Sequence, residues 1–231
     1  AAEIGGADRV ELCDNLVEGG TTPSLGAIAV AHSMLGIKLH IIVRPRGGDF
    51  RYSGTEFEVM KSDVKFAKML GVDGVVIGIL NADGTVDRER TRELVEIARP
   101  MSVTFHRAFD MTRDPFEAME TLVDIGIDRV LTSGQESVAE KGVELIRELV
   151  ERASERITIM ACGEIREGNV SEVIRGTGVK EIHATGFVTR ESDMQFRNER
   201  VYMGGADLDA EYSIKATSAE KIAALRGAAE Q

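Results

Sequence analysis

The sequence predicts an α/β fold, a TIM-type (β/α)8 barrel formed as one domain over residues 1–231. Two observations lead to this fold class. Strand-like and helix-like segments alternate along the chain, as in proteins with a parallel sheet. One pattern also recurs in the segments GADRVEL, GVDGVVI, GIDRVLT and GVKEIHA, which begin at Gly6, Gly71, Gly126 and Gly178. In each, a glycine that can end a helix in the left-handed conformation precedes a β-branched strand.

Seven strands are predicted from these junctions and from the apolar runs between them. Their ranges are 10–13, 38–44, 74–80, 102–107, 129–133, 157–162 and 181–185. The recurrent junction marks every second strand, and the chain opens on such a junction. These strands are therefore expected to be the second to the eighth, with the first strand upstream of Ala1. A doubly wound open sheet is the alternative, but it calls for a Gly-rich phosphate turn after an early strand, and no G-x-G-x-x-G motif occurs.

Helices are predicted between the strands because apolar residues recur at three- and four-residue spacing, as at Phe116, Met119, Leu122 and Val123. The predicted helices include 56–70, 88–98, 115–125, 138–153 and a final helix at about 217–229. A long polar loop is expected over 187–213, after the last strand. In a barrel it would lie on the functional face, and a surface insertion or an oligomer contact is an equal alternative.

Composition excludes several classes of protein. The formal net charge of −11 argues against a broad nucleic-acid or anionic-membrane surface. No apolar run reaches the length of a membrane span, and the sequence has no signal-peptide pattern at its start. The two cysteines, Cys13 and Cys162, form no disulfide framework and indicate a reducing, cytoplasmic setting. Each thiol is equally well explained as a small buried apolar residue.

Alternation along the predicted strands places one set of polar side chains inside the barrel. The set comprises Glu11, Cys13, His40, Arg44, Thr104, His106, Glu181 and His183. His40 and Glu181 come early in their strands, where paired structural roles are expected. The others come late, at the end where barrel active sites form.

Two kinds of site are compatible with these residues. For acid–base chemistry the candidates are Glu11, His106 and Asp110, with Arg44, Arg46, Ser133, Gly163 and His183 as ligands for an anionic substrate. The arginines could instead form internal ion pairs with Glu11 or Asp110. For a metal site the candidates are Cys13 and His106, although their separation in the sequence is not a metal-binding spacing. No nucleotide cofactor is expected.

Several of these residues belong to motifs that resemble the CutC family, which is named for copper homeostasis. The motifs are ELCDNLVEGGTTPS (11–24), IVRPRGGDF (42–50), VTFHRAFD (103–110), DRVLTSG (128–134) and IMACGEI (159–165). The resemblance implies a TIM-type barrel, a cytoplasmic protein, copper as the candidate cofactor and a homodimer. In the family the first strand usually carries another cysteine, the proposed partner of the one matching Cys13. Residues 162–164 depart from the family's Gly-rich turn, which weakens a phosphate-site interpretation.

Two functional hypotheses follow. The first is a copper homeostasis protein that binds copper at the barrel mouth. The second is an enzyme that acts on a small anionic substrate, such as a phosphorylated or carboxylated sugar, by acid–base chemistry. A scaffolding barrel with a vestigial site is a third alternative.

Overall fold

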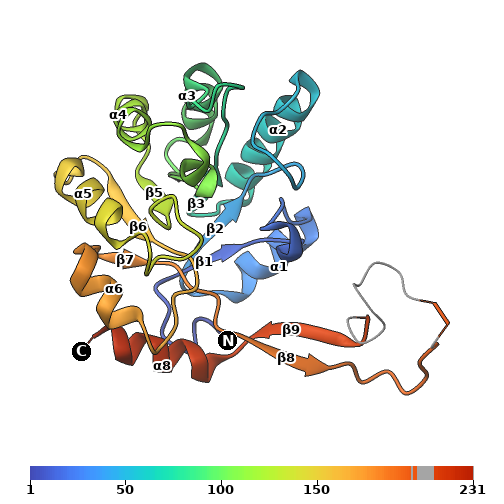
Figure 1. Ribbon diagram of the computed structural model, residues 1–231. Helices are drawn as coiled ribbons and strands as arrows, with labels where there is room; N and C mark the ends of the chain where they lie inside the picture. Colours follow the sequence, from blue (N-terminus) through green and yellow to red (C-terminus); the bar gives the residue numbers. More distant parts are fainter. Residues whose placement is uncertain (199, 202–210, 231) are drawn as a thin grey trace.

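The computed structural model describes residues 1–198, 200–201 and 211–230. Its main feature is a parallel sheet of seven strands in the order β1-β2-β3-β4-β5-β6-β7. The strands are β1 (Arg9–Leu12), β2 (Lys38–Ile42), β3 (Gly74–Ile77), β4 (Ser102–Phe105), β5 (Arg129–Thr132), β6 (Thr158–Ala161) and β7 (Glu181–Ile182). The sheet curls into a half-barrel with the helices arrayed around its outside (Figure 1).

A helix follows each strand from β1 to β6 before the next strand of the sheet, and a last helix comes near the end of the chain. The helices are α1 (Leu25–Met34), α2 (Gly54–Leu70), α3 (Arg88–Ala98), α4 (Pro115–Ile125), α5 (Val143–Ala153), α6 (Val170–Thr177) and α8 (Ala219–Ala229). Two short 3-10 helices, η1 (Leu16–Glu18) and η2 (Arg107–Met111), follow β1 and β4. The α/β fold of TIM type is therefore confirmed, and all seven predicted strands are present. The expected first strand would precede Ala1 and stays a prediction.

The recurrent glycines end helices as predicted. Gly71, Gly126 and Gly178 cap α2, α4 and α6 with φ angles of 78°, 87° and 74°. Gly6 precedes β1 with a φ of 87°. A side chain with a Cβ would be strained in this left-handed region, so only glycine turns the chain cheaply from helix to strand. These four positions set where the next strand begins.

Alternation along the strands sorts the side chains into two layers. In β2, Leu39 and Ile41 are buried in the main core between sheet and helices, as is Val43 just after the strand. The side chains between them, such as His40, face the concave side of the sheet, the barrel lumen. A smaller buried cluster of Leu131, Met160 and Cys162 lies on that side of β5 and β6.

Polar contacts low in the lumen join strands that are not neighbours. The Glu181 carboxylate of β7 accepts from Arg9 of β1 over 2.6 Å and from Arg129 of β5 over 2.8 Å. His40 is buried over Gly74, where an added Cβ would lie 2.6 Å from the imidazole. Burial, and then the neighbouring Arg9 and Arg129 charges, lower the pKa of His40 to about 4. Glu181 is thus paired, as expected for its low position.

The segment after β7 differs from the predicted loop over 187–213. It begins as strand β8 (Phe187–Glu191) and leads into strand β9 (Ser213–Thr217), and the two strands pair antiparallel. This hairpin, which we call the arm, projects from the half-barrel (Figure 1). The prediction missed the strands because β8 carries alternating polar residues that alone do not distinguish a strand from a loop. Residues 199 and 202–210 of the predicted loop lie outside the described residues.

Among the helices of the described residues, none combines the length and apolar character that a membrane span requires.

Candidate functional site

The end of β1 brings together three of the predicted site residues. The Cys13 thiol donates a hydrogen bond to Oε1 of Glu11 over 3.6 Å. The other oxygen of Glu11, Oε2, lies 3.6 Å from Nδ1 of His183, which follows β7. Since β1 and β7 are the two outer strands of the sheet, Glu11 links the open sides of the half-barrel. A thiol, a carboxylate and an imidazole therefore lie in a row at the barrel mouth.

The Cys13 thiol is held in its protonated form. Burial raises its pKa well above the ordinary value, and the Glu11 charge and hydrogen bond act in the same direction. Thiolate, the reactive and metal-binding form, is therefore disfavoured until a cation replaces the proton. The second thiol, Cys162, is buried beside Leu131 and Met160, and burial raises its pKa as well.

His106 lies apart from this row, at the end of β4. Its Nδ1 accepts a hydrogen bond from the backbone N–H of Ala108 over 3.1 Å. Nδ1 therefore carries no proton, and the neutral ring must hold its proton on Nε2. Nε2 is buried without a hydrogen-bond partner among the described residues. The imidazole packs against Phe50, with ring centroids 5.0 Å apart.

Burial, and then the Arg44 charge, lower the pKa of His106 to about 3. The ring is therefore neutral across the physiological range and can donate only from Nε2. A general acid or base should have a pKa near the working pH. A metal would need the lone pair of Nε2, which carries the proton while Nδ1 accepts from Ala108. The geometry thus favours neither the predicted acid–base role nor the predicted metal role of His106.

Arg44 is fastened to the loops around it. Its Nη1 donates to the carbonyl oxygens of Glu18 and Gly20 over 2.6 and 2.8 Å, and its Nη2 donates to that of Gly48 over 2.8 Å. The guanidinium also lies over the Phe50 ring, 5.1 Å from its centroid. Only 5 % of Arg44 is exposed. The side chain therefore ties the loop after β1 to the loop after β2.

Arg46 is likewise engaged within its own loop. It donates to the Glu56 carboxylate over 2.6 Å and to the Asp49 carboxylate over 3.0 Å. It also donates to the carbonyl oxygens of Gly47, Asp49 and Arg51. With both arginines engaged in this way, these contacts give no support to the anion clamp predicted from Arg44 and Arg46, which stays a prediction.

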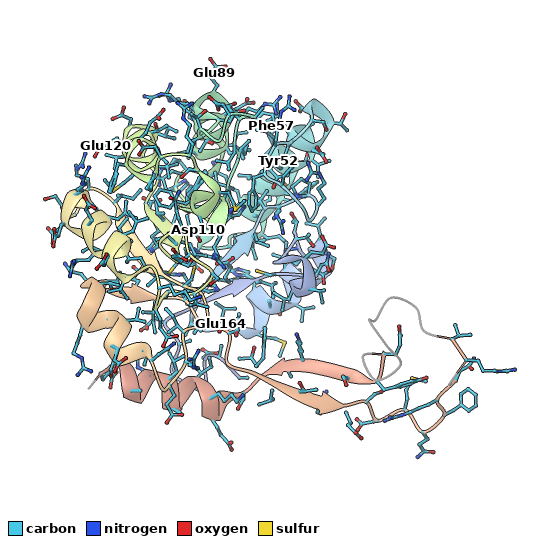
Figure 2. The ribbon with its side chains drawn as sticks, in the orientation of Figure 1. Tyr52, Phe57, Glu89, Asp110, Glu120 and Glu164 are labelled. Atoms are coloured by element: carbon cyan, nitrogen blue, oxygen red, sulfur yellow. The ribbon has the colours of Figure 1, made fainter. Side chains whose placement is uncertain are left out.

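Asp110 organises the loop after β5. Its carboxylate accepts from the Thr132 hydroxyl over 2.5 Å, from the Ser133 backbone N–H over 3.1 Å and from the Gln135 backbone N–H over 3.2 Å. Arg107 adds an ion pair of 2.7 Å. Figure 2 places Asp110 in the interior of the half-barrel, whereas Glu89 and Glu120 lie on the outer helices. Its lone pairs are taken, so the arrangement favours a structural role over the predicted catalytic one.

The predicted anion ligands Ser133 and Gly163 belong to the same loop region. The Ser133 hydroxyl is fully buried, donates to the carbonyl of Glu136 over 2.5 Å and accepts from Arg107 over 2.6 Å. Gly163 has a φ of 96°, and an added Cβ would lie 3.0 Å from that of Ser133. Gly163 therefore serves close packing of the loops after β5 and β6.

Two residues that contribute to this region were not predicted from the sequence. Phe50 packs on both Arg44 and His106. Ala108 fixes the tautomer of His106 through a backbone N–H. Neither residue type carries a chemical signal. Only the position of Phe50 directly after the RPRGGD stretch could have suggested a cover for that loop.

The described part of the chain contains no group of three or more His, Cys, Asp or Glu side chains arranged to hold a metal ion. The Cys13 sulfur and the His183 imidazole each lie beside one oxygen of the Glu11 carboxylate near β1. Sulfur and imidazole nitrogen suit a soft ion.

Fold and site together define a class of protein. It is a TIM-type half-barrel with a thiol, Cys13, at its mouth, and its arginines Arg44 and Arg46 bind groups of their own chain. Comparison with known proteins makes the class specific. The model of the CutC family matches residues 1–188. A copper homeostasis protein cutC homolog from Homo sapiens is 48 % identical over 99 % of this chain and 84 % of its own length. A CutC family protein from Mesorhizobium japonicum is 51 % identical over 99 % of this chain and 89 % of its own length.

A solved structure supports the same conclusion. The crystal structure of a CutC protein from Streptococcus agalactiae superposes with a TM-score of 0.74 at 37 % identity, and the match covers 77 % of this chain and 88 % of that one. The chain therefore belongs to the CutC family, as its sequence motifs predict.

Proposed function

We propose that this chain acts in copper homeostasis in the cytoplasm, and that it binds Cu(I) at the barrel mouth through Cys13. The single observation that carries the proposal is the row formed by Cys13, Glu11 and His183, with 3.6 Å between neighbouring groups. The names of the human and mouse relatives, both copper homeostasis protein homologs, support the general role.

Copper is the cargo in this proposal, and the chain's own residues divide the work. Cys13 supplies a sulfur ligand, which Cu(I) prefers, and His183 supplies a nitrogen. Glu11 lies beside Nδ1 of His183, so Nε2 is the nitrogen that meets the ion. Glu11 also accepts from the thiol, so one carboxylate contacts both proposed ligands. The Cys13 proton leaves when the ion binds.

The test is a competition titration of the full chain against a chromophoric Cu(I) chelator. Cys13→Ser should weaken Cu(I) binding by about a hundredfold and His183→Ala by about tenfold, because each removes a ligand. Cys162→Ala and His32→Ala are matched controls. The Cys162 thiol is buried in the lumen, and the His32 imidazole is exposed on α1. Both controls should bind as the parent does.

Equal affinity of Cys13→Ser and the parent chain would overturn this proposal. If His106→Asn weakens Cu(I) binding and His183→Ala does not, the nitrogen ligand is His106 at the end of β4.

The alternative, an enzyme acting on a small anionic substrate, gains no support from the contacts. Arg44 and Arg46 are both engaged with groups of their own chain.

A further inference from the structure

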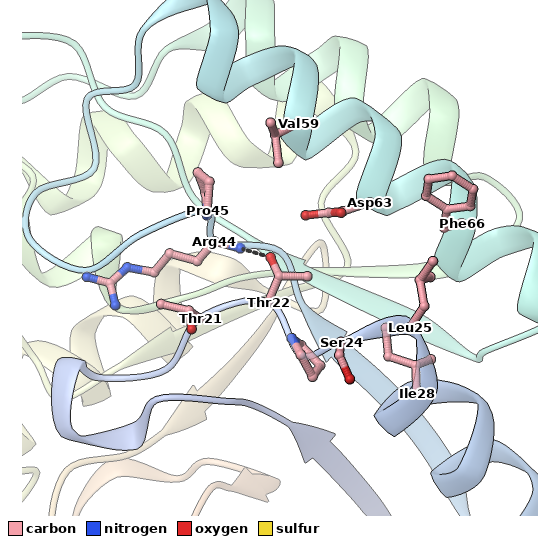
Figure 3. Close-up of a pocket in the computed structure, with 11 residues that line it drawn as sticks. Thr21, Thr22, Ser24, Leu25, Ile28, Arg44, Pro45, Val59, Asp63 and Phe66 are labelled. Carbon is pink, nitrogen blue, oxygen red and sulfur yellow. Dashed lines mark hydrogen bonds between the residues drawn. The ribbon is translucent and has the colours of Figure 1, made fainter. Parts of the chain in front are cut away.

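A cavity of about 330 Å³ lies between helices α1 and α2, and none of the proposed copper ligands lines it. Its walls include four apolar side chains, Leu25 and Ile28 of α1 and Val59 and Phe66 of α2 (Figure 3). Ile28 is buried, whereas Leu25, Val59 and Phe66 remain 50, 45 and 43 % exposed. The volume is at the lower end of the range of small-molecule pockets. The cavity therefore suits a small ligand with an apolar body.

One carboxylate, that of Asp63 on α2, points into the cavity (Figure 3). Burial raises the pKa of this carboxyl group despite a hydrogen bond with Thr22, and no charged side chain contributes to the shift. Arg44 also lines the cavity, but its guanidinium points away (Figure 3) and donates to backbone carbonyls of the surrounding loops. Among the described residues, no Lys, Arg or His therefore provides a cation for Asp63.

Thr22 positions the Asp63 carboxylate. The Thr22 backbone N–H donates to the Arg44 carbonyl oxygen over 2.9 Å, and the Thr22 hydroxyl accepts from the Arg44 backbone N–H over 2.9 Å. Because the hydroxyl oxygen already accepts from the backbone, its own proton is free to bind Asp63. One proton occupies one carboxylate oxygen, so the other oxygen is available to a ligand. The anionic end of the cavity is thus formed before a ligand arrives, which lowers the cost of binding.

We propose that this cavity binds a small organic ammonium ion, whose nitrogen pairs with Asp63 and whose short aliphatic body lies against the apolar walls. Charge complementarity selects the ligand, since a partly desolvated carboxylate is costly until a cation meets it. A divalent metal ion would need several oxygen ligands and would leave the apolar walls unused. A neutral apolar molecule would fill the cavity but leave the carboxylate without a cation.

Three probes with the same carbon chain test the charge requirement on the parent chain: hexylammonium, hexanol and hexanoate. Hexylammonium should bind with a dissociation constant of about 1 mM or below, and hexanol at least about tenfold more weakly because it lacks the charge. Hexanoate should be the weakest, since like charges repel. NMR titration measures the affinities, and shifts of the Leu25, Ile28 and Val59 methyl groups locate the probe. Hexanol or hexanoate binding as tightly as hexylammonium would overturn the proposal.

A fourth probe separates a small amine from a lysine side chain of a partner protein. N-acetyl-lysine amide carries the same ammonium group on a peptide body. It should bind more weakly than hexylammonium, because its amide groups would meet apolar walls without hydrogen-bond partners. Tighter binding of this probe would assign the cavity to a protein partner and overturn the small-molecule ligand.

Asp63→Asn removes the charge and keeps the shape of the side chain. It should weaken hexylammonium binding by about tenfold and leave hexanol binding unchanged, because only the ion pair is lost. Glu96→Gln is the control, since Glu96 is exposed on α3 and does not line the cavity. Asp63→Asn binding hexylammonium as tightly as the parent chain would contradict the proposed ion pair.

Phe66→Ala removes one apolar wall and should weaken hexylammonium binding by about fivefold, because less apolar surface is buried. Met69→Ala is the matched control on the same helix, since Met69 is 80 % exposed and outside the cavity walls. Equal affinities of these two variants would place the amine on the surface beside Asp63 and not in the cavity.

Amine binding at this cavity is separate from copper binding at the barrel mouth. Asp63→Asn should therefore bind Cu(I) as the parent chain does in the chelator competition. Failure of hexylammonium to bind at up to about 50 mM would overturn the amine site and leave the copper proposal standing.

Discussion

The imidazole of His106 has one ring nitrogen occupied, since Nδ1 accepts a hydrogen bond from the backbone N–H of Ala108. This contact and the burial of the ring determine its protonation: neutral, with the proton on Nε2. Charging the ring would cost both the hydrogen bond and its burial next to Arg44. A second imidazole of the lumen, His40, is also buried in its neutral form.

We expect these two imidazoles to make the folded chain less stable in acid. Their pKa values lie at about 3 and about 4 in the folded state, against 6.5 in the unfolded chain. Between about pH 6.5 and pH 4 the unfolded chain therefore binds more protons, so the free energy of unfolding falls as the pH is lowered. Urea denaturation at several pH values measures how steeply the free energy of unfolding depends on pH. His106→Asn should reduce this slope by the equivalent of about one bound proton.

His32 provides the control for this slope, because it is exposed on α1. His32→Gln should leave the slope as it is. A slope unchanged by His106→Asn would show that this ring is already protonated in the folded state.

Strand β3 carries glycine where its neighbours carry large lumen side chains. Gly74 lies under His40, and Gly78, just after the strand, lies under His106. An added Cβ at Gly78 would be 2.5 Å from Nδ1 of His106 and 2.8 Å from the Ala108 Cβ. The two imidazoles can therefore occupy the lumen only because β3 leaves room for them.

Gly78→Ala should lower the free energy of unfolding by roughly 1–3 kcal/mol, since it overpacks the lumen and displaces the His106 ring. The matched control is Gly227→Ala in α8, where an added Cβ has nothing within 4 Å. That change should be neutral or stabilising by up to about 1 kcal/mol, because alanine favours the helix. Urea denaturation measures the free energy of unfolding of both variants. Equal values would show that the lumen can accommodate a methyl group at position 78.

One carboxylate joins three strands across the whole half-barrel. Glu181 of β7 accepts from Arg9 of β1 and from Arg129 of β5, and Arg129 also donates to the Ser102 hydroxyl of β4 over 2.7 Å. Burial raises the pKa of Glu181, but the two arginines outweigh it and the net shift is downward. The carboxylate therefore stabilises the fold above its ordinary pKa, and this contribution is lost as the pH falls through its lowered value.

We expect Glu181→Gln to lower the free energy of unfolding by roughly 2 kcal/mol at neutral pH, because both arginines lose a charged acceptor in a partly buried site. The control is Glu155→Gln, whose ion pair with Lys180 is fully exposed to solvent. That variant should change stability by less than about 0.5 kcal/mol. Denaturant unfolding measures both, and equal effects would refute a joining role for Glu181.

The sequence allowed much of the architecture to be predicted, because the signals were local. Glycines at positions 71, 126 and 178 marked helix ends, and alternation in the strands sorted lumen from core. The site was predicted less well. Residues with the right chemistry were found, such as Cys13 and Glu11, but Arg44 and Asp110 turned out to serve neighbouring loops. A side chain's partner depends on loops distant in the sequence, which local patterns do not describe.

Sequence alone determined the family, the order of strands and helices, and which polar side chains face the lumen. It could do so because helix ends and strand alternation depend on near neighbours along the chain. Tertiary structure alone decided that His183 lies beside Glu11, which also contacts Cys13, and that the segment after β7 forms an arm. Those outcomes depend on how the sheet curves to bring distant strands together and on which backbone groups contact each side chain. Local sequence patterns contain neither kind of information.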